Sequence, residues 1–194
     1  MDVAVEEISG AWYVGYVLDK HVKSSEFLGY NAFGHPEFDT KRTEVGESMY
    51  QLKYKGDRSQ IPLLAETFIE NLKSKFSSVR FIVPVPPSKH RTFQPLIELA
   101  KAVAKKMDIP IFENILIKNV ETPQMKDIAA TEDKMSTLLK AFSINDGINN
   151  DVCWDALIID DLYSSGSSLN AATKTLKTYS KVKNIYVAAF TRTK

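Results

Sequence analysis

Two adjacent carboxylates and a serine-rich loop are the residues of this chain best suited to chemistry. Asp160 and Asp161 follow the apolar run Ala156–Ile159, and a helix pattern begins soon after them. The loop between the acidic pair and this helix contains Ser164, Ser165, Gly166, Ser167 and Ser168. Carboxylates accept hydrogen bonds from the vicinal hydroxyls of a sugar or lie near a bound Mg²⁺, whereas small hydroxylated residues, a glycine and a helix N-terminus suit a phosphate. The stretch therefore predicts a cradle for ribose 5-phosphate, with the diol at one end and the monophosphate at the other.

Each half of this stretch also has a simpler structural explanation. An acidic turn after a strand and a serine at the start of a helix are common local features. The complete order of apolar strand, acidic pair, serine-glycine-serine loop and helix is much more specific, and it favours the phosphate cradle. The pattern G-x-x-x-x-G-K-[ST] does not occur in the sequence, which disfavours a P-loop NTPase.

Alternating helix and strand patterns position this stretch. Helical spacing of apolar residues predicts helices over about 61–75, from Pro95 to Met107, and over about 168–179. Short apolar runs predict buried strands at 81–85, 156–159 and 185–190. This alternation predicts an α/β fold with a parallel sheet flanked by helices, in which ligands bind beyond the carboxyl ends of the strands.

The N-terminal part of the chain has a different composition, which is richer in aromatic and turn-forming residues. We expect a small N-terminal β-containing lobe over 1–56, followed by the main domain over 57–194. The lobe is predicted to contain strands at 12–18 and 26–30, a loop over 31–43, and a strand or short helix at 48–54. Further along, short strands are predicted at 109–112 and 115–117, and a polar flap at 118–140.

Composition limits the classes of protein to which this chain can belong. The 194 residues suit one domain, or one domain with a small appendage. With 25 Lys+Arg against 24 Asp+Glu, and no basic stripe with interleaved aromatics, direct binding to nucleic acid is unlikely. Cys153 is the single cysteine, so an internal disulfide and a Cys-rich zinc site are excluded, and we expect a cytoplasmic protein. We find no signal peptide and no stretch long enough to span a membrane.

The segment over 157–168 resembles the signature of type I phosphoribosyltransferases that binds 5-phosphoribosyl 1-pyrophosphate (PRPP). Within this superfamily the chain is most similar to the ComF-like competence-protein branch. Gln51 to Asp57 (QLKYKGD) resembles the Lys-Tyr-x-Gly-Asp element of that branch, the VPVP run over 83–86 its pyrophosphate-loop entry, and Arg91 to Gln94 its Arg-Gly-Phe-Asn-Gln element. The chain departs from the branch in lacking the Cys-rich zinc ribbon and in replacing the glycine and asparagine of the last element.

The resemblance implies a phosphoribosyltransferase that uses PRPP and Mg²⁺ and releases pyrophosphate. Asp160 and Asp161 would hold the ribose hydroxyls and favour the oxocarbenium character of the transition state, and Ser164 to Ser168 would fix the 5-phosphate. Lys89 and Arg91 are candidates to meet pyrophosphate, and Lys53 and Lys55 could face an anionic ligand. The Mg²⁺ is expected to arrive with PRPP, with no protein residue assigned directly to it. A homodimer is possible.

Two points stay open at the level of sequence. The first is whether the chain is an enzyme or a non-catalytic PRPP- or nucleotide-binding regulator, such as a competence-type accessory protein for DNA uptake. The second is the acceptor, for which no residue pair indicates a particular base. Tyr163, within the cradle, could cover the ribose or point to solvent.

Overall fold

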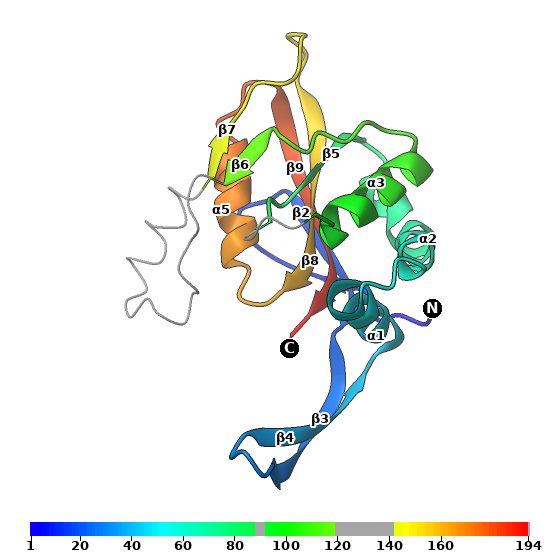
Figure 1. Ribbon diagram of the computed structural model, residues 1–194. Coiled ribbons are helices and arrows are strands. Elements are labelled where there is room, and N and C mark those ends of the chain that lie inside the picture. The colour runs from blue at the N-terminus through cyan, green and yellow to red at the C-terminus, as the bar shows by residue number, and fades with distance from the viewer. Residues whose placement is uncertain (88–91, 119–141, 194) are drawn as a thin grey trace.

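The central feature of the computed structural model, which describes residues 1–87, 92–118 and 142–193, is a five-stranded sheet (Figure 1). Its strand order is β1-β2-β9-β8-β5. The strands are β1 (Glu6–Glu7), β2 (Val14–Lys20), β5 (Val79–Pro84), β8 (Trp154–Tyr163) and β9 (Val182–Arg192). β2, β9, β8 and β5 run parallel, and only β1 pairs in the antiparallel direction. The carboxyl ends of the four parallel strands therefore share one edge of the sheet.

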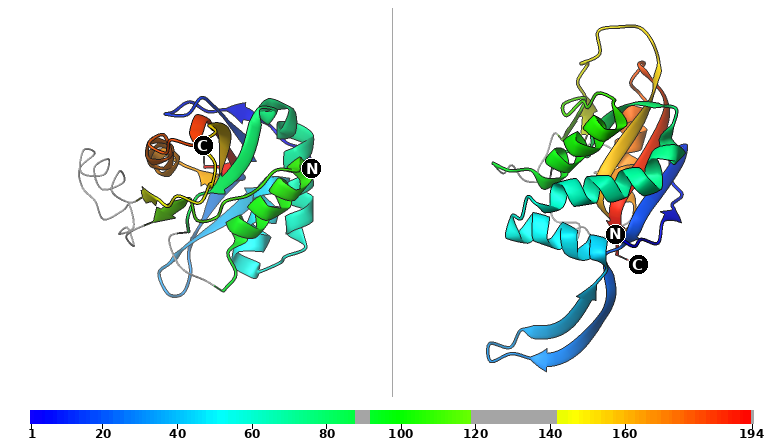
Figure 2. Two further views of the ribbon diagram at one scale, coloured as in Figure 1. Left: turned by 90° about the horizontal axis from the view of Figure 1, so that it is seen from above. Right: turned by 90° about the vertical axis from the view of Figure 1, so that its right-hand side faces the viewer.

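Helices cover both faces of this sheet (Figures 1 and 2). One face carries α1 (Glu44–Tyr50), the π-helical turn η1 (Gln51–Lys55), α2 (Gln60–Leu72), the 3₁₀ turn η2 (Lys73–Phe76) and α3 (Pro95–Met107). The other face carries α5 (Ser167–Leu176) and the small hairpin of β6 (Leu116–Lys118) and β7 (Phe142–Ile144). The α/β architecture predicted from sequence is confirmed. Among the described residues no helix has both the length and the apolar character that a membrane crossing requires.

The side chains of β8 are buried on both faces of the sheet, which explains why the sequence of this strand contains an uninterrupted apolar run. Ala156 and Ile158 pack into the core on the α5 side, whereas Leu157 and Ile159 pack into the core on the side of α2 and α3. All four side chains are fully buried. Because successive side chains of a strand point to opposite faces, Asp160 continues the α5 side and Asp161 continues the side of α1 to α3.

The first 56 residues are divided between the sheet and a separate arm. The strand predicted at 12–18 forms as β2 within the central sheet, where it pairs with β9. Only β3 (Val22–Tyr30) and β4 (Pro36–Arg42) stand apart, as an antiparallel hairpin that projects from the body (Figures 1 and 2). The lobe boundary at residue 56 stays a prediction.

One local prediction needs correction, and the structure decides between strand and short helix for the segment over 48–54. The loop predicted over 31–43 is wrong for most of its length, because Pro36–Arg42 pairs with β3 along the arm. The segment over 48–54 is helical, since α1 continues directly into the π turn. Thr43 starts that helix, with its side-chain oxygen accepting a hydrogen bond from the Gly46 amide at 2.9 Å. The predicted flap falls almost entirely outside the described residues.

Candidate functional site

The acidic pair lies near the carboxyl end of β8, at the edge of the sheet where the parallel strands end. Asp160 and Asp161 are followed by only two more residues of the strand. The Asp161 amide donates a hydrogen bond to Oδ1 of Asp160 at 2.8 Å, which fixes the first carboxylate against the backbone. The two side chains leave the strand end on opposite faces, and the Asp161 carboxylate is near enough to Asp160 to act on its charge.

Lysines balance the two carboxylates from opposite sides. The Lys53 ammonium nitrogen lies 2.6 Å from Oδ2 of Asp161, and the two side chains are only 25% and 23% exposed. Lys118, at the end of β6, acts electrostatically on Asp160. Lys53 belongs to the π turn η1. Such turns are rare in proteins, and those that occur are often found at functional sites. Lys55 of the same turn is exposed and forms no ion pair within the described part of the chain.

Asp160 has an unusual protonation behaviour. Burial, followed by the neighbouring Asp161 carboxylate, raises the pKa of Asp160 to about 7. The Asp161 amide and the ammonium groups of Lys53 and Lys118 oppose that rise. Near neutral pH this carboxyl group therefore exchanges its proton readily, and a ligand that donates hydrogen bonds or carries positive charge will favour its ionised form.

The serine-rich loop forms a tight elbow between β8 and α5. Gly166 caps the helix with φ 72°, a left-handed conformation that glycine adopts without a Cβ penalty. The Gly166 carbonyl accepts hydrogen bonds from the backbone and side-chain nitrogens of Asn170, at 2.8 and 3.0 Å. The Asn170 side chain in turn accepts a hydrogen bond from the Ala11 amide at 2.8 Å. This network anchors the first turn of α5.

The first amides of the elbow helix are available to a ligand. Within the described residues, the backbone N–H groups of Gly166, Ser168 and Leu169 donate to no protein acceptor. The Ser167 amide donates a long hydrogen bond of 3.4 Å to the Ser165 hydroxyl, and the hydroxyls of these two serines bond to each other at 2.8 Å. Unpaired N–H groups at a helix N-terminus, with the positive end of the helix dipole, form a favourable site for a phosphate.

Tyr163 supports the elbow from behind. A Cβ placed on Gly166 would lie 2.9 Å from the Tyr163 ring, so the ring and the glycine backbone are in direct contact. The same ring packs against the core on the α5 side. The ring therefore packs against the loop and the core and does not simply point to solvent, and contact with the ribose stays a prediction. The sequence offered only an indirect signal, an aromatic residue three positions before a glycine.

The loop after β5 starts at the same edge of the sheet. Pro84 pairs with Ile159, and the Val85 amide donates a hydrogen bond to the Ile159 carbonyl at 2.9 Å. The loop predicted to meet pyrophosphate thus starts beside the acidic pair. Lys89 and Arg91 lie outside the described residues, so their role stays a prediction.

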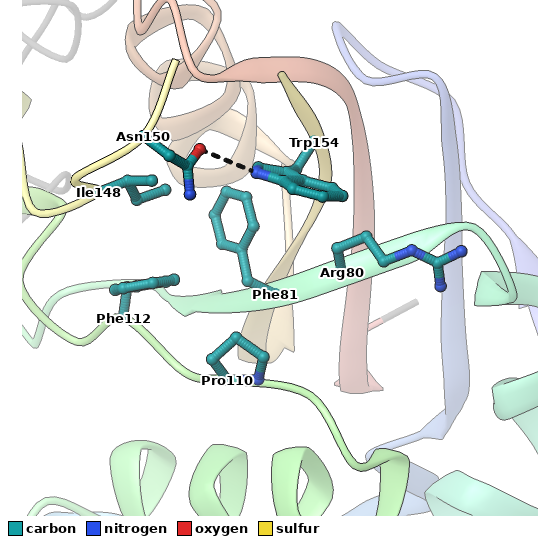
Figure 3. Close-up of a pocket in the computed structure, with 7 residues that line it drawn as sticks. All are labelled: Arg80, Phe81, Pro110, Phe112, Ile148, Asn150 and Trp154. Atoms are coloured by element: carbon teal, nitrogen blue, oxygen red, sulfur yellow. Dashed lines mark hydrogen bonds between the residues drawn. The ribbon is translucent and has the colours of Figure 1, made fainter. Parts of the chain in front are cut away.

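A second feature lies at the opposite end of the strands. An apolar pocket of about 300 Å³ opens near the amino ends of β5 and β8 (Figure 3). Its lining residues are Arg80, Phe81, Pro110, Phe112, Ile148, Asn150 and Trp154. The Trp154 indole nitrogen donates a 3.4 Å hydrogen bond to Asn150 within it. None of the lining side chains is a carboxylate or serine, so this pocket is separate from the candidate site.

This chain is similar to known proteins in its structure, as comparisons with solved structures show. No model of a known protein family matches the sequence, and no curated protein sequence matches it. Adenine phosphoribosyl transferase from Trypanosoma brucei, solved with AMP, pyrophosphate and ribose-5-phosphate, superposes with a TM-score of 0.50 at 15% identity, over 97% of this chain and 74% of that one. Adenine phosphoribosyltransferase from Leishmania tarentolae gives 0.50 at 10% identity, over 98% and 95% of the two chains. The chain therefore has the fold of the type I phosphoribosyltransferases.

Proposed function

We propose that the protein is a phosphoribosyltransferase that binds PRPP with Mg²⁺ and transfers the phosphoribosyl group to a nitrogen nucleophile, releasing pyrophosphate. The observation that carries this proposal is the placement of the acidic pair and the unpaired elbow amides. Both lie at the carboxyl edge of the sheet, joined by the last two residues of β8 and by residues 164–166, which connect β8 to α5. A ribose with hydroxyls at one end and a phosphate at the other fits both groups at once.

The acidic pair would act on the sugar ring. Asp160 and Asp161 each accept a hydrogen bond from one ribose hydroxyl, and an ionised carboxylate is the stronger acceptor. Their negative charge stabilises positive charge that develops at the anomeric carbon as the bond to pyrophosphate breaks. The nitrogen nucleophile then forms the new bond to that carbon, and pyrophosphate leaves with the electron pair of the broken bond.

The elbow would act at a distance from the reacting carbon. The amides of Gly166, Ser168 and Leu169 and the hydroxyls around them bind the 5-phosphate. This remote binding energy holds the anomeric carbon in position and so lowers the entropic cost of the reaction. Lys89 and Arg91 are proposed to neutralise the departing pyrophosphate.

We expect Mg²⁺ to enter this site bound to the substrate PRPP. Within the described part of the chain, no three His, Cys, Asp or Glu side chains group to hold a metal ion. Mg²⁺ commonly binds through substrate phosphates and one or two carboxylates, and such an ion would neutralise charge on the leaving pyrophosphate. Asp160 and Asp161 are the carboxylates nearest to that position in the proposal.

Lys53 is proposed to keep the acidic pair ready for the sugar. Its ammonium holds one oxygen of Asp161, which leaves the other oxygen for a hydroxyl, and its charge opposes protonation of Asp160.

The variant Lys53→Met keeps the aliphatic stem and removes the charge, so PRPP affinity at pH 7 should fall roughly tenfold. Lys55→Met is the matched control, since it removes one positive charge from the same turn at an exposed position, and its affinity should change less than about twofold. Equal losses in the two variants, measured by calorimetry, would mean that only overall charge matters.

A second candidate is a PRPP-binding regulator of the ComF-like, competence-associated type. The substitutions in the Arg-Gly-Phe-Asn-Gln element favour it, because the resemblance assigns this element to the pyrophosphate side of the site. Such a protein would retain the ribose and phosphate contacts and lack turnover. Under either proposal a cytoplasmic location is expected, where the exposed thiol of Cys153 stays reduced.

Ligand-induced stabilisation tests the two candidates together. Millimolar PRPP with Mg²⁺ should raise the melting temperature, because a ligand of the folded state stabilises it by mass action. An unchanged melting temperature would rule out both candidates. Pyrophosphate release across a panel of bases and amines then separates them: turnover supports the enzyme, and tight PRPP binding without turnover supports the regulator.

A further inference from the structure

The apolar pocket at the amino ends of β5 and β8 plays no part in the proposed reaction, and its walls are largely aromatic (Figure 3). Phe81 of β5 is buried in the core on the α5 side, and Phe112 and Trp154 pack against that core as half-buried side chains. The Phe81 and Phe112 rings meet edge to face, with their centroids 5.4 Å apart. Aromatic walls of this kind favour contact with another flat ring system.

Hydrogen bonds hold the walls of this pocket in place. On one side, a short segment after α3 extends the sheet beside β5. The Ile82 amide donates to the Pro110 carbonyl at 3.0 Å, and the Phe112 amide donates to the Ile82 carbonyl at 2.9 Å. On the other side, the Ile148 amide donates to the hydroxyl of the buried Tyr179 at 3.2 Å. The cavity of about 300 Å³ is therefore formed before any ligand arrives, and its volume is at the lower end of the range of small-molecule sites.

One hydrogen-bond donor points into the pocket. The side-chain oxygen of Asn150 accepts hydrogen bonds from the Val152 amide at 3.1 Å and from the Trp154 indole at 3.4 Å. Both partners can only donate, so they fix the position of the amide oxygen and turn the amide nitrogen the other way. In Figure 3 this nitrogen points into the space bordered by Ile148 and Phe81. It donates to no acceptor in the described part of the chain, so it is available to a ligand.

The pocket offers no charge to a ligand. Among the described residues that line it, only Arg80 is ionisable. Figure 3 shows the Arg80 guanidinium turned away from the pocket, and its Nη1 donates a long hydrogen bond of 3.4 Å to the Ser77 carbonyl. A phosphate or carboxylate placed among these apolar walls would lose its hydration without gaining a cation. The pocket therefore selects against PRPP and nucleotides.

We propose that this pocket binds an uncharged, flat aromatic molecule that carries a carbonyl group. Its rings would lie against Phe81, Phe112 and Trp154, and its carbonyl oxygen would accept a hydrogen bond from the side-chain nitrogen of Asn150. Trp154 lies six residues before Asp160 on β8, a distance of roughly 20 Å along an extended strand. A ligand in this pocket therefore does not reach the candidate site.

Titration of the isotope-labelled full chain with coumarin, followed by nuclear magnetic resonance, tests this inference. Coumarin is a flat, uncharged molecule of two fused rings, with a carbonyl group and no hydrogen-bond donor. The signals of the Trp154 indole and the Asn150 side-chain amide should shift and saturate, with a dissociation constant below about 1 mM. The amide signals from Asp160 to Gly166 should stay where they are.

Asn150→Asp tests the contact to the carbonyl. The variant keeps an oxygen for the Val152 amide and the Trp154 indole, and it replaces the donor nitrogen with a second acceptor. Coumarin affinity should therefore fall at least about tenfold. Asn145→Asp is the matched control, because it makes the same chemical change at an exposed position between β7 and the pocket loop, outside the lining, and its affinity should stay within about twofold of wild type.

Three results would overturn the inference. The first is the absence of a saturable shift at millimolar coumarin. The second is a shift confined to other signals, such as those of the exposed aromatic residues of the arm or of the candidate site, which would place the molecule elsewhere. The third is an equal loss in Asn150→Asp and Asn145→Asp, which would mean that only the added charge matters. The titration contains no PRPP, so its outcome does not depend on the proposed function.

Discussion

The double variant Asp160→Asn/Asp161→Asn should bind PRPP with Mg²⁺ about a hundredfold or more weakly than wild type. Each substitution replaces a carboxylate acceptor with an amide of nearly the same shape, and hydrogen bonds to charged groups contribute roughly 1.5–3 kcal/mol each. Calorimetry at pH 8, above the pKa of about 7 that burial and Asp161 produce at Asp160, measures the loss with the wild-type Asp160 carboxylate ionised. If the double variant binds PRPP with unchanged affinity, the acidic pair does not contact the ribose.

Asp155→Asn is the matched control for this experiment. Asp155 lies on the same strand at its opposite end, where it accepts hydrogen bonds from the backbone and side chain of Asn184. The same chemical change at that position should leave PRPP affinity within about twofold of wild type. A comparable loss in Asp155→Asn would indicate a general effect on β8 and not a contact with the sugar.

The protonation of Asp160 adds a pH dependence to the same measurement. The ionised carboxylate of Asp160 is a stronger acceptor for its ribose hydroxyl than the protonated form, so wild-type affinity should rise as pH increases through about 7. Asp160→Asn should lack that part of the rise. Without ligand, the free energy of unfolding should change with pH in the opposite direction. The Asp160 carboxyl has a pKa of about 7 in the folded state and 3.8 in the unfolded state, so between these values the folded state binds the proton more strongly. The stability that this difference contributes is therefore lost as pH rises from 3.8 to about 7. A wild-type stability profile identical to that of Asp160→Asn would contradict the raised pKa.

Gly166→Ala should have the second largest effect, a loss of ribose 5-phosphate affinity of at least tenfold. The new Cβ would occupy a left-handed backbone position, which costs roughly 1–2 kcal/mol, and it would lie 2.9 Å from the Tyr163 ring. Relief of that contact must move either the ring or the elbow, and movement of the elbow redirects the amides that are proposed to bind phosphate. Thermal unfolding and calorimetry with ribose 5-phosphate measure the two consequences.

Gly34→Ala separates backbone strain from the steric contact. Gly34 has φ 75°, close to the 72° of Gly166, but nothing lies within 4 Å of the position of its Cβ. This control should lose stability by roughly 1–2 kcal/mol and keep ribose 5-phosphate affinity. If Gly166→Ala behaves like Gly34→Ala in both measurements, the elbow does not hold the phosphate.

The parts of the candidate site that could be predicted from the sequence are those encoded over a short stretch. The acidic pair, the elbow and the start of α5 are contiguous, so an apolar run, two carboxylates and a glycine among serines were enough to predict their order. The helix over Pro95–Met107 was equally clear, because its apolar spacing and its proline at the first turn agree.

The parts that the sequence did not reveal depend on contacts between distant segments. The ion pair of Lys53 with Asp161 depends on the π turn that contains Lys53, and no periodicity in the sequence indicates such a turn. In the arm, Gly34 and Pro36 indicated a loop, yet pairing with β3 makes Pro36–Arg42 a strand. Tyr163 could be placed only once the backbone of Gly166 was known.

A crystal structure of the complex with ribose 5-phosphate tests the central claim most directly. The account predicts the phosphate on the amides of Gly166, Ser168 and Leu169, and the two ring hydroxyls on Asp160 and Asp161. A phosphate bound elsewhere, or a sugar whose hydroxyls do not reach these carboxylates while the phosphate occupies the elbow, would contradict it.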